Sequence, residues 1–120
     1  MFVGIDCLDN DRINKIISNE KFLNKYFTDY EINYASKTIN KSMRLAGIFC
    51  AKEAFLKAIE IGITGDIPLK EIEVKHKKSG SPYLVLSNNA QKLVNSLNIS
   101  EIKVSISHTG NLSLAICVLL

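Results

Sequence analysis

The sequence predicts an α+β fold in which an antiparallel sheet packs on a long central helix, and three observations support this prediction. The stretch from Lys41 to Ile61 is apolar nearly all round at helical spacing, which is typical of a buried helix. From Glu71 onward the apolar residues recur at every second position, which is typical of strands. Turn signals separate these strands, so helices and antiparallel hairpins occupy different parts of the chain.

The N-terminal part predicts one strand followed by short helices. The apolar run Phe2–Leu8 suits a buried strand and would place Asp6 near the carboxyl end of that strand. Three helical segments are expected next, two of them opened by polar capping residues at 9–11 and 28–29. They lie at about 12–17, 22–27 and 31–36.

The long helix is expected to carry Ile63 on its apolar face and to end at Gly62, Gly65 and Pro68. Two hairpins with a helix between them should follow. The helix starts at a polar cap and runs to Leu97, and the tract 75–78 is interpreted as a solvated loop. The hairpin strands are expected at about 71–75, 83–86, 102–107 and 112–120, with turns at 79–82 and 108–111.

Composition limits the classes of protein that fit the chain. Its 120 residues suit a single domain spanning 1–120, and the 15 Lys plus Arg against 12 Asp plus Glu give a net charge of +3. A pI of 8.8 with few arginines argues against a dedicated nucleic-acid-binding protein. The N-terminus has no basic region before its apolar stretch, so no signal peptide is expected. The apolar run at 112–120 is too short to span a bilayer, so we expect a cytoplasmic protein without membrane partners.

The three cysteines also favour a cytoplasmic protein. Cys7, Cys50 and Cys117 are odd in number, far apart and set among apolar neighbours. Neither histidine lies at zinc-finger spacing from them. We interpret all three as buried, reduced thiols.

Three features suggest chemistry, and each has a structural alternative. Glu53 and Lys57 lie in the most apolar helix, either as an ordinary i,i+4 pair or as groups that bind a cation and a phosphate. Asp6 is either a turn residue or a metal ligand. His108 at a strand end is either a solvated turn residue or a ligand-binding group.

Taken together, the three features favour a phosphate ligand held with Mg²⁺. Two separate carboxylates that leave coordination positions for water and phosphate are typical of Mg²⁺ sites. No P-loop or Gly-x-Gly-x-x-Gly is present, so a conventional nucleotide-binding fold is not expected. A serine nucleophile beside His108 is rejected because no Gly-x-Ser-x-Gly turn is present.

On these residues the chain resembles the holo-acyl-carrier-protein synthases, the small group of 4′-phosphopantetheinyl transferases. The resemblance covers nearly the whole chain. It rests on Gly4-Ile5-Asp6 with Arg12-Ile13, FCAKEAFLKA (49–58), Gly80-Ser81-Pro82-Tyr83 and VSISHTG (104–110).

The resemblance implies transfer of phosphopantetheine from coenzyme A to a serine of apo-acyl carrier protein, with release of adenosine 3′,5′-bisphosphate, as a step serving fatty acid biosynthesis. It also implies a homotrimer with sites between subunits. Asp6, Glu53 and Lys57 would be catalytic, with Asp6 and Glu53 holding Mg²⁺. Coenzyme A would be bound by Lys57, Lys52, His108 and Thr109, with His108 coming from a neighbouring subunit, and the acidic carrier protein by Arg12, Lys15 and Lys21.

The sequence departs from the family pattern at two places, and it leaves open both the general base and a competing function. Ile48 stands where the family often has an arginine, so one phosphate contact is missing. Glu60-Ile61-Gly62 stands where the family usually has Gly-Thr-Gly, so the coenzyme pocket is expected to differ in shape. The group that removes the serine proton is Lys57, Glu53 or a metal-bound water. The competing hypothesis is a non-catalytic module whose basic face binds an acidic protein or a nucleotide.

Overall fold

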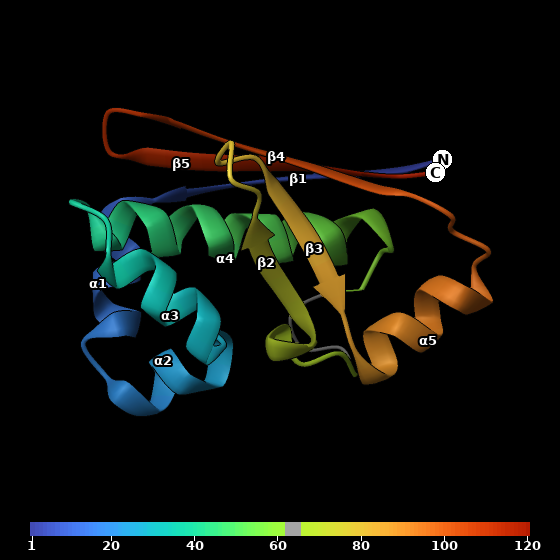
Figure 1. The fold of residues 1–120 in the computed structure, drawn as a ribbon, viewed down its shortest axis with the longest axis horizontal. Coiled ribbons are helices and arrows are strands. Elements are labelled where there is room, and N and C mark those ends of the chain that lie inside the picture. Colours follow the sequence, from blue (N-terminus) through green and yellow to red (C-terminus); the bar gives the residue numbers. More distant parts are fainter. Residues whose placement is uncertain (62–65) are drawn as a thin grey trace.

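The computed structural model describes residues 1–61 and 66–120 and has an α+β fold, with an antiparallel sheet packed on one side of a long helix (Figure 1). A second, two-stranded sheet lies on the other side of that helix. The elements are β1 (Phe2–Asp9), α1 (Asn10–Ile17), α2 (Glu20–Tyr26), α3 (Asp29–Ser36), α4 (Lys41–Ala58), the 3-10 helix η1 (Leu69–Glu71), β2 (Ile72–His76), β3 (Pro82–Leu86), α5 (Asn88–Ser96), β4 (Ile102–Thr109) and β5 (Leu112–Leu119).

The larger sheet has the strand order β1-β5-β4, and both pairings are antiparallel. The N- and C-terminal strands therefore lie side by side, with β1 at an edge of the sheet (Figure 1). His108 and Thr109 belong to β4 and pair with Ser113 and Leu112, so the expected loop at 108–111 was too long. The turn itself is Gly110-Asn111, and Gly110 adopts a φ of +55° that favours glycine.

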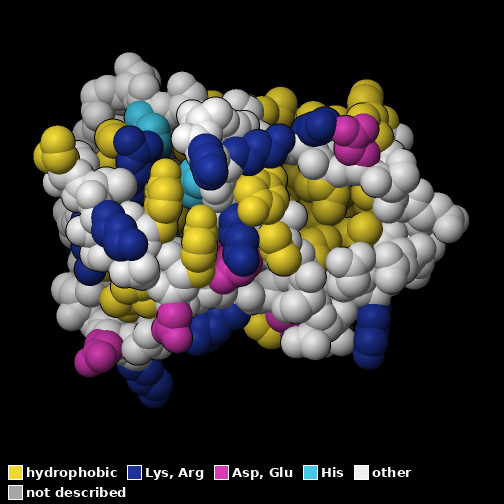
Figure 2. Space-filling view, viewed as in Figure 1, with side chains coloured by type: hydrophobic (Ala, Val, Ile, Leu, Met, Phe, Trp, Pro, Cys, Tyr) yellow, Lys and Arg dark blue, Asp and Glu magenta, His cyan; other side chains and the backbone are white. Residues whose placement is uncertain are grey.

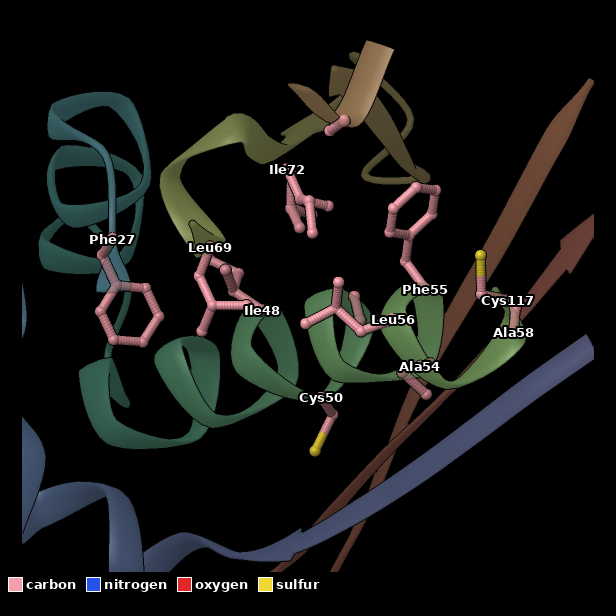
Figure 3. Packing of buried hydrophobic residues seen from close by; sticks show 14 of the residues in the cluster. Phe27, Ile48, Cys50, Ala54, Phe55, Leu56, Ala58, Leu69, Ile72 and Cys117 are labelled. Atoms are coloured by element: carbon pink, nitrogen blue, oxygen red, sulfur yellow. The ribbon is translucent and has the colours of Figure 1, made fainter. Parts of the chain in front are cut away.

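Helix α4 has 18 residues and packs on both sides, as its all-round apolar pattern predicted. Figure 3 shows Cys50 and Ala54 on the side of β1, while Ile48 and Leu56 point toward η1 and β2. The core of the protein therefore has α4 at its centre, with one layer on each side.

The helix ends earlier than the sequence indicated. Ile59 is the C-cap, and Glu60 follows with a φ of +62°, so a non-glycine residue makes the left-handed turn. The prediction that the helix reached residue 61 was wrong. The expected roles of Gly62, Ile63 and Gly65 lie outside the described residues.

Close contact between β1 and α4 depends on Gly4. A Cβ atom at Gly4 would clash with the carbonyl oxygen of Ala54 and lie 2.6 Å from the backbone nitrogen of Ala58. Because backbone meets backbone at this point, neither side has a flexible atom that yields. Gly4 therefore fixes how near the following residues of β1 come to the last turns of α4.

Capping residues account for the short N-terminal helices. The Asp9 carboxylate accepts a hydrogen bond from the Asp11 amide at 2.9 Å and begins α1. Thr28 and Glu31 form a capping box at the start of α3, with distances of 3.3 and 2.8 Å. Both caps confirm the sequence prediction that polar clusters open these helices.

The cysteine prediction is confirmed for two of the three residues. Cys50 and Cys117 are buried free thiols, but Cys7 is exposed because its side chain lies on the open face of β1. Among the described residues, no helix has the length and apolar character needed to cross a bilayer.

Candidate functional site

Asp6 lies in the middle of β1, opposite Ala115 of β5, and not at the end of the strand as predicted. Its Oδ1 accepts a hydrogen bond from Lys57 Nζ at 2.9 Å. The lysine side chain is 53% exposed and the aspartate side chain 15%, so the pair lies at the edge of the sheet facing solvent. Lys57 thus pairs with Asp6, and the simple i,i+4 pair with Glu53 is not what the structure shows.

Glu53 lies one turn before Lys57 on α4, within electrostatic range of Asp6. Burial raises the pKa of the Glu53 carboxyl, the negative charge of Asp6 raises this pKa further, and Lys57 opposes both effects. Glu53 Oε1 is buried and makes no hydrogen bond within the described part of the chain. An unpartnered carboxylate oxygen beside a second carboxylate is an unfavourable arrangement unless a cation is shared between the two.

These two carboxylates fit a hydrated divalent cation. In residues 1–61 and 66–120, no group of three or more His, Cys, Asp or Glu side chains converges as a closed metal site. A pair of carboxylates leaves coordination positions for water and phosphate, which suits the reluctance of Mg²⁺ to lose its hydration. The chemistry of the donor set is therefore that of an open site at which a cation and an anionic ligand meet.

The Lys57 ammonium is held in its charged form by its surroundings. The hydrogen bond to Asp6 is the main cause of the raised pKa of Lys57, and the nearby carboxylates contribute further. The amine therefore carries a positive charge at neutral pH, beside the two carboxylates and at the solvent edge. A negatively charged group that approaches Asp6 and Glu53 would meet this charge as well.

Cys50 lies next to this site, and its thiol is unreactive. Burial is the main cause that raises the pKa of its thiol to about 12, and the charge of Asp6 adds to it. The Sγ atom donates to the carbonyl oxygen of Ser113 at 3.6 Å. A protonated, buried thiol is a poor nucleophile, so Cys50 contributes packing between α4 and the sheet.

Lys52 does not have the position that its predicted role in coenzyme binding requires. Its side chain is fully buried, and its Nζ donates to Glu31 Oε1 at 2.6 Å and to the carbonyl oxygens of Tyr26 and Leu69 at 2.8 and 3.1 Å. The second carboxylate oxygen of Glu31 accepts from the Val74 amide at 2.7 Å. All three donors of the ammonium are therefore used internally, and Lys52 ties α4 to α2, α3 and η1.

His108 faces α4 and is anchored through β5. Its Nδ1 lies 2.7 Å from Ser113 Oγ, and the Ser113 hydroxyl donates its single proton to Asn10 Oδ1 at 2.5 Å. His108 Nδ1 is therefore the donor in this contact, which leaves Nε2 free for another partner. Thr109 is exposed at the end of β4.

Within one chain, His108 does not reach the carboxylates. Its ring packs on Gly47, six positions before Glu53 on α4. Six residues of helix span about 9 Å. The structure thus brings Asp6, Glu53 and Lys57 together and leaves His108 beside the middle of α4, with Thr109 at the end of β4.

The three basic residues expected to receive a carrier protein lie on two helices. Arg12 and Lys15 are exposed on α1, and their spacing of three residues places them on neighbouring parts of its surface. Lys21 is exposed on α2, which packs on α1. All three side chains are open to solvent, as a docking surface requires.

The sequence analysis identified His108 but not the residues that surround it. Arg44, Gly47 and His108 line a pocket with His76 and Tyr34, and the His76 and Tyr34 rings stack with centroids 3.9 Å apart. His76 belongs to β2, so the interpretation of 75–78 as a solvated loop was wrong for this residue. A glycine in the middle of an apolar helix was the signal available, because it marks a close approach.

Comparison with known proteins identifies the family of the chain. The profile of the 4′-phosphopantetheinyl transferase superfamily matches residues 2–117. The holo-[acyl-carrier-protein] synthase of Halothermothrix orenii is 40% identical over 118 residues, which cover 97% of this chain and 94% of the relative. The corresponding synthase of Fusobacterium nucleatum is 36% identical over 119 residues, covering 98% and 97% of the two chains.

Solved structures of such synthases have the same fold. The crystal structure from Neisseria meningitidis superimposes with a TM-score of 0.89 at 26% identity, covering 99% of this chain and 97% of the other. The Helicobacter pylori synthase in complex with coenzyme A gives a TM-score of 0.86 at 29% identity, covering 98% and 99%. The chain therefore belongs to the holo-[acyl-carrier-protein] synthases of the 4′-phosphopantetheinyl transferase superfamily.

Proposed function

We propose that this chain transfers the 4′-phosphopantetheine group of coenzyme A to a serine hydroxyl of an apo-acyl carrier protein in a Mg²⁺-dependent reaction. The single observation that carries the proposal is the convergence of Asp6, Glu53 and Lys57 at the edge of β1 in a chain of this family. In the reaction the serine oxygen forms a bond to phosphorus, and the bond from that phosphorus to the bridging oxygen breaks. Adenosine 3′,5′-bisphosphate leaves with the bridging oxygen, and the serine proton is released. The setting is the cytoplasm, and the holo-carrier product serves fatty acid biosynthesis.

Asp6 and Glu53 are the residues that would hold the metal ion. The buried, unpartnered Oε1 of Glu53 supports this assignment, because the described residues offer it no hydrogen bond. A bound Mg²⁺ supplies positive charge that neutralises the diphosphate of coenzyme A. Both carboxylates lie on rigid elements, a strand and a helix held together at Gly4, so their separation is set before any ligand arrives.

Lys57 supplies a second positive charge at the same edge. Its ammonium is exposed and held by one hydrogen bond to Asp6, so donors remain for an anionic ligand. An ammonium acts on phosphate mainly as a point charge, and it stabilises charge that gathers on the phosphoryl oxygens during transfer. We assign Lys57 to the diphosphate.

A homotrimer with sites between subunits completes the proposal. In one chain, His108 packs on Gly47, about 9 Å along α4 from Glu53, so the two side chains do not meet at one phosphate group. The outer face of the larger sheet is apolar: Val3 and Ile5 are each 60% exposed. Covering this face with a second copy of the chain would remove apolar surface from water, and the same contact would bring His108 of one subunit toward the carboxylates of another.

Arg12, Lys15 and Lys21 are proposed as the docking surface for the acidic carrier protein. Exposed lysine and arginine side chains of this kind mainly speed encounter and fix orientation. Their contribution should therefore weaken as salt is added, since charges in water are screened over about 10 Å at 0.1 M.

The test is a transfer assay with mass spectrometry of the carrier protein. Purified chain, coenzyme A, Mg²⁺ and apo-carrier protein should give a carrier one phosphopantetheine heavier, and a chelator should abolish the product. Asp6→Asn and Glu53→Gln should each remove the activity while the far-ultraviolet circular dichroism spectrum is retained. Carrier binding without a mass change, indifferent to chelator, would instead support the non-catalytic basic module.

A further inference from the structure

The core contains two uncharged polar side chains, Asn10 and Ser113, which are 5% and 0% exposed. The other buried polar residues among those described, Glu31 and Lys52, form an ion pair with each other. Ser113 belongs to the buried side of β5, where the remaining residues are apolar. A polar group in such surroundings lowers the stability of the fold unless it is hydrogen-bonded. The hydrogen bonds of Asn10 and Ser113 therefore indicate what the two residues do.

The two side chains form a hydrogen-bonded chain that ends at His108. Ser113 Oγ donates to Asn10 Oδ1 at 2.5 Å, and His108 Nδ1 lies 2.7 Å from the same Oγ atom. Since the hydroxyl has one proton and gives it to the Asn10 amide oxygen, Oγ accepts a hydrogen bond from Nδ1. Neutral His108 is therefore the Nδ1-protonated tautomer, with its lone pair on Nε2.

This order of donors and acceptors lets the ring change charge without losing its internal hydrogen bond. A proton added to neutral His108 binds at Nε2, while Nδ1 continues to donate to Ser113. The Asn10 amide accepts from the Ser113 hydroxyl, which makes Oγ a better acceptor for the imidazolium. In the opposite tautomer the added proton would have to bind at Nδ1, and the Ser113 hydroxyl would first have to turn away.

Nε2 is on the side of the ring that a ligand can reach. It lies over Gly47, where a Cβ atom would be 3.3 Å from Nε2. His108 is half-buried, and Figure 2 shows histidine side chains at the surface among lysine and arginine side chains. The charged or titratable side chains beside the ring are Arg44 of α4, His76 of β2 and Tyr34 of α3. Within residues 1–61 and 66–120, Nδ1 alone of the two ring nitrogens is hydrogen-bonded.

The position of the Asn10 amide oxygen is fixed by contacts at the start of α1. The Asn10 backbone N–H donates to the carbonyl oxygen of Asn111 at 2.7 Å, and the Asn111 side chain donates to Asp9 Oδ1 at 2.6 Å. Asn10 is thus held by its backbone as well as by its side chain, where the β4–β5 turn meets α1. A residue that orients another side chain needs such a fixed position.

We propose that Asn10 and Ser113 are positioning residues for His108, which hold Nδ1 as an internal donor so that Nε2 alone exchanges a proton and meets the substrate. The inference rests on the proposed function, in which His108 reaches the coenzyme A bound at the carboxylates of another subunit. Asn10 and Ser113 are buried, so they act on the substrate only through the ring. The bond made by one ring nitrogen determines the protonation of the other.

The first test determines the tautomer by ¹⁵N NMR of the ring nitrogens at about pH 8. Burial is the main cause that lowers the pKa of His108, and the charge of Arg44 lowers it further, so the ring is neutral at this pH. The chain has two histidines, and a His76→Gln sample assigns their signals. Wild-type His108 should be protonated at Nδ1. Asn10→Leu should move the proton to Nε2, because the Ser113 hydroxyl loses its acceptor and donates to Nδ1 instead.

Two further variants are matched to Asn10→Leu. Asn10→Asp keeps an oxygen acceptor at the same place, so the Nδ1 tautomer should be retained, and the negative charge should raise the pKa of His108. Asn111→Ala removes a hydrogen bond at the same junction but none in the chain to His108, and it should leave the tautomer unchanged. The His76 signal reports whether each variant keeps the wild-type fold. A wild-type His108 protonated at Nε2, or one tautomer in all four proteins, would overturn the proposal.

The second test measures the steady-state kinetics of transfer. Asn10→Leu should lower kcat/KM for coenzyme A about tenfold, as expected when a hydrogen bond to a charged group is weakened, and Asn10→Asp should keep the wild-type value. In a His108→Gln chain, Asn10→Leu should have no further effect, because it acts through the ring. Additive losses in the double variant would show a structural role only and would refute the positioning role.

The outcomes separate this inference from the proposed function. Transfer by the wild type with a kcat/KM that Asn10→Leu leaves unchanged would rule out the positioning role and leave the transferase intact. A chain that transfers nothing but shows the change of tautomer would count against the proposed function and support the hydrogen-bonded chain, which the NMR experiment tests without substrate.

Discussion

Lys57 Nζ lies 2.9 Å from Asp6 Oδ1, although 51 positions separate the two residues in the sequence. The contact joins the last turn of α4 to the edge strand β1, and Glu53 lies one helical turn away on the same helix. The carboxylate pair therefore depends on how closely β1 approaches α4, which is set at Gly4, two residues before Asp6.

Gly4→Ala should move β1 away from α4 and so disrupt the contact between Asp6 and Lys57. The added methyl group meets the backbone of Ala54 and Ala58, so β1 must move away from α4. We expect the free energy of unfolding to fall by about 3 kcal/mol, at the upper end for an overpacked core, measured by urea denaturation. Gly80→Asn is the matched control, because nothing lies near Gly80 and asparagine tolerates its positive φ. Equal unfolding midpoints for Gly4→Ala and wild type would contradict the close approach.

Lys57→Ala tests whether Lys57 contributes to the transfer reaction rather than to the stability of the fold. The Asp6–Lys57 pair lies at the surface, so its loss should change the free energy of unfolding by less than about 1 kcal/mol. The rate of phosphopantetheine transfer should fall about a hundredfold or more, as for removal of one charge-stabilising donor. Lys92→Ala serves as the exposed control. A Lys57→Ala enzyme with wild-type turnover would remove this residue from the diphosphate.

Glu53→Gln should make the metal-free protein more stable and inactive. Glu53 carries a partly buried carboxylate near Asp6, and the amide removes that repulsion while keeping the shape of the side chain. The melting temperature without metal should rise by a few degrees, in line with relief of about 1 kcal/mol. Mg²⁺ should raise the melting temperature of the wild type and leave the variant unchanged, because binding to the folded state alone stabilises it. A variant that melts below the wild type and still responds to Mg²⁺ would refute the assignment.

The sequence was sufficient for those parts of the fold that local signals determine. Caps at Asp9 and Thr28, the all-round apolar α4 and the alternating strands each lie in a short window, and the structure has them nearly where expected. The end of α4 was missed because Glu60, a residue with no glycine-like signature, makes the left-handed turn.

Asp6, Glu53 and Lys57 could be singled out from the sequence as candidates, but the contacts of the lysines could not be predicted. Lys52 and Lys57 lie five positions apart in the same apolar helix, and nothing local distinguishes them. Tertiary packing does so: Lys52 meets a buried carboxylate from α3, while Lys57 meets Asp6 from the edge strand. The pocket at Arg44 and His76 was missed for the same reason, since α4 and β2 come together only in the folded chain.

Lys52→Met tests whether Lys52 stabilises the fold through Glu31 instead of binding coenzyme A. The substitution leaves Glu31 as a fully buried carboxylate without its cation, and breaking such a pair typically costs about 3–5 kcal/mol. Urea denaturation should show that loss, and Lys57→Met should remain within about 1 kcal/mol of wild type. Wild-type stability in Lys52→Met together with weakened coenzyme A binding would restore Lys52 to the ligand site.

Mixing two inactive variants tests whether the active site is shared between subunits. Asp6→Asn removes a group from the carboxylate pair, and His108→Gln removes one that packs on Gly47, about 9 Å along α4 from Glu53. If each site takes Asp6 from one chain and His108 from another, some sites in a mixed assembly contain both wild-type residues. Co-refolded Asp6→Asn and His108→Gln chains should therefore recover a fraction of wild-type transfer activity that neither variant has alone.

The control is a mixture of Asp6→Asn and Glu53→Gln chains, which should recover no activity. Asp6 and Glu53 of a site come from the same subunit, so every site in this mixture lacks one of the two carboxylates. Sedimentation velocity must show that the mixed chains associate. With association established, an inactive mixture of Asp6→Asn and His108→Gln would mean that each chain supplies both groups to its own site.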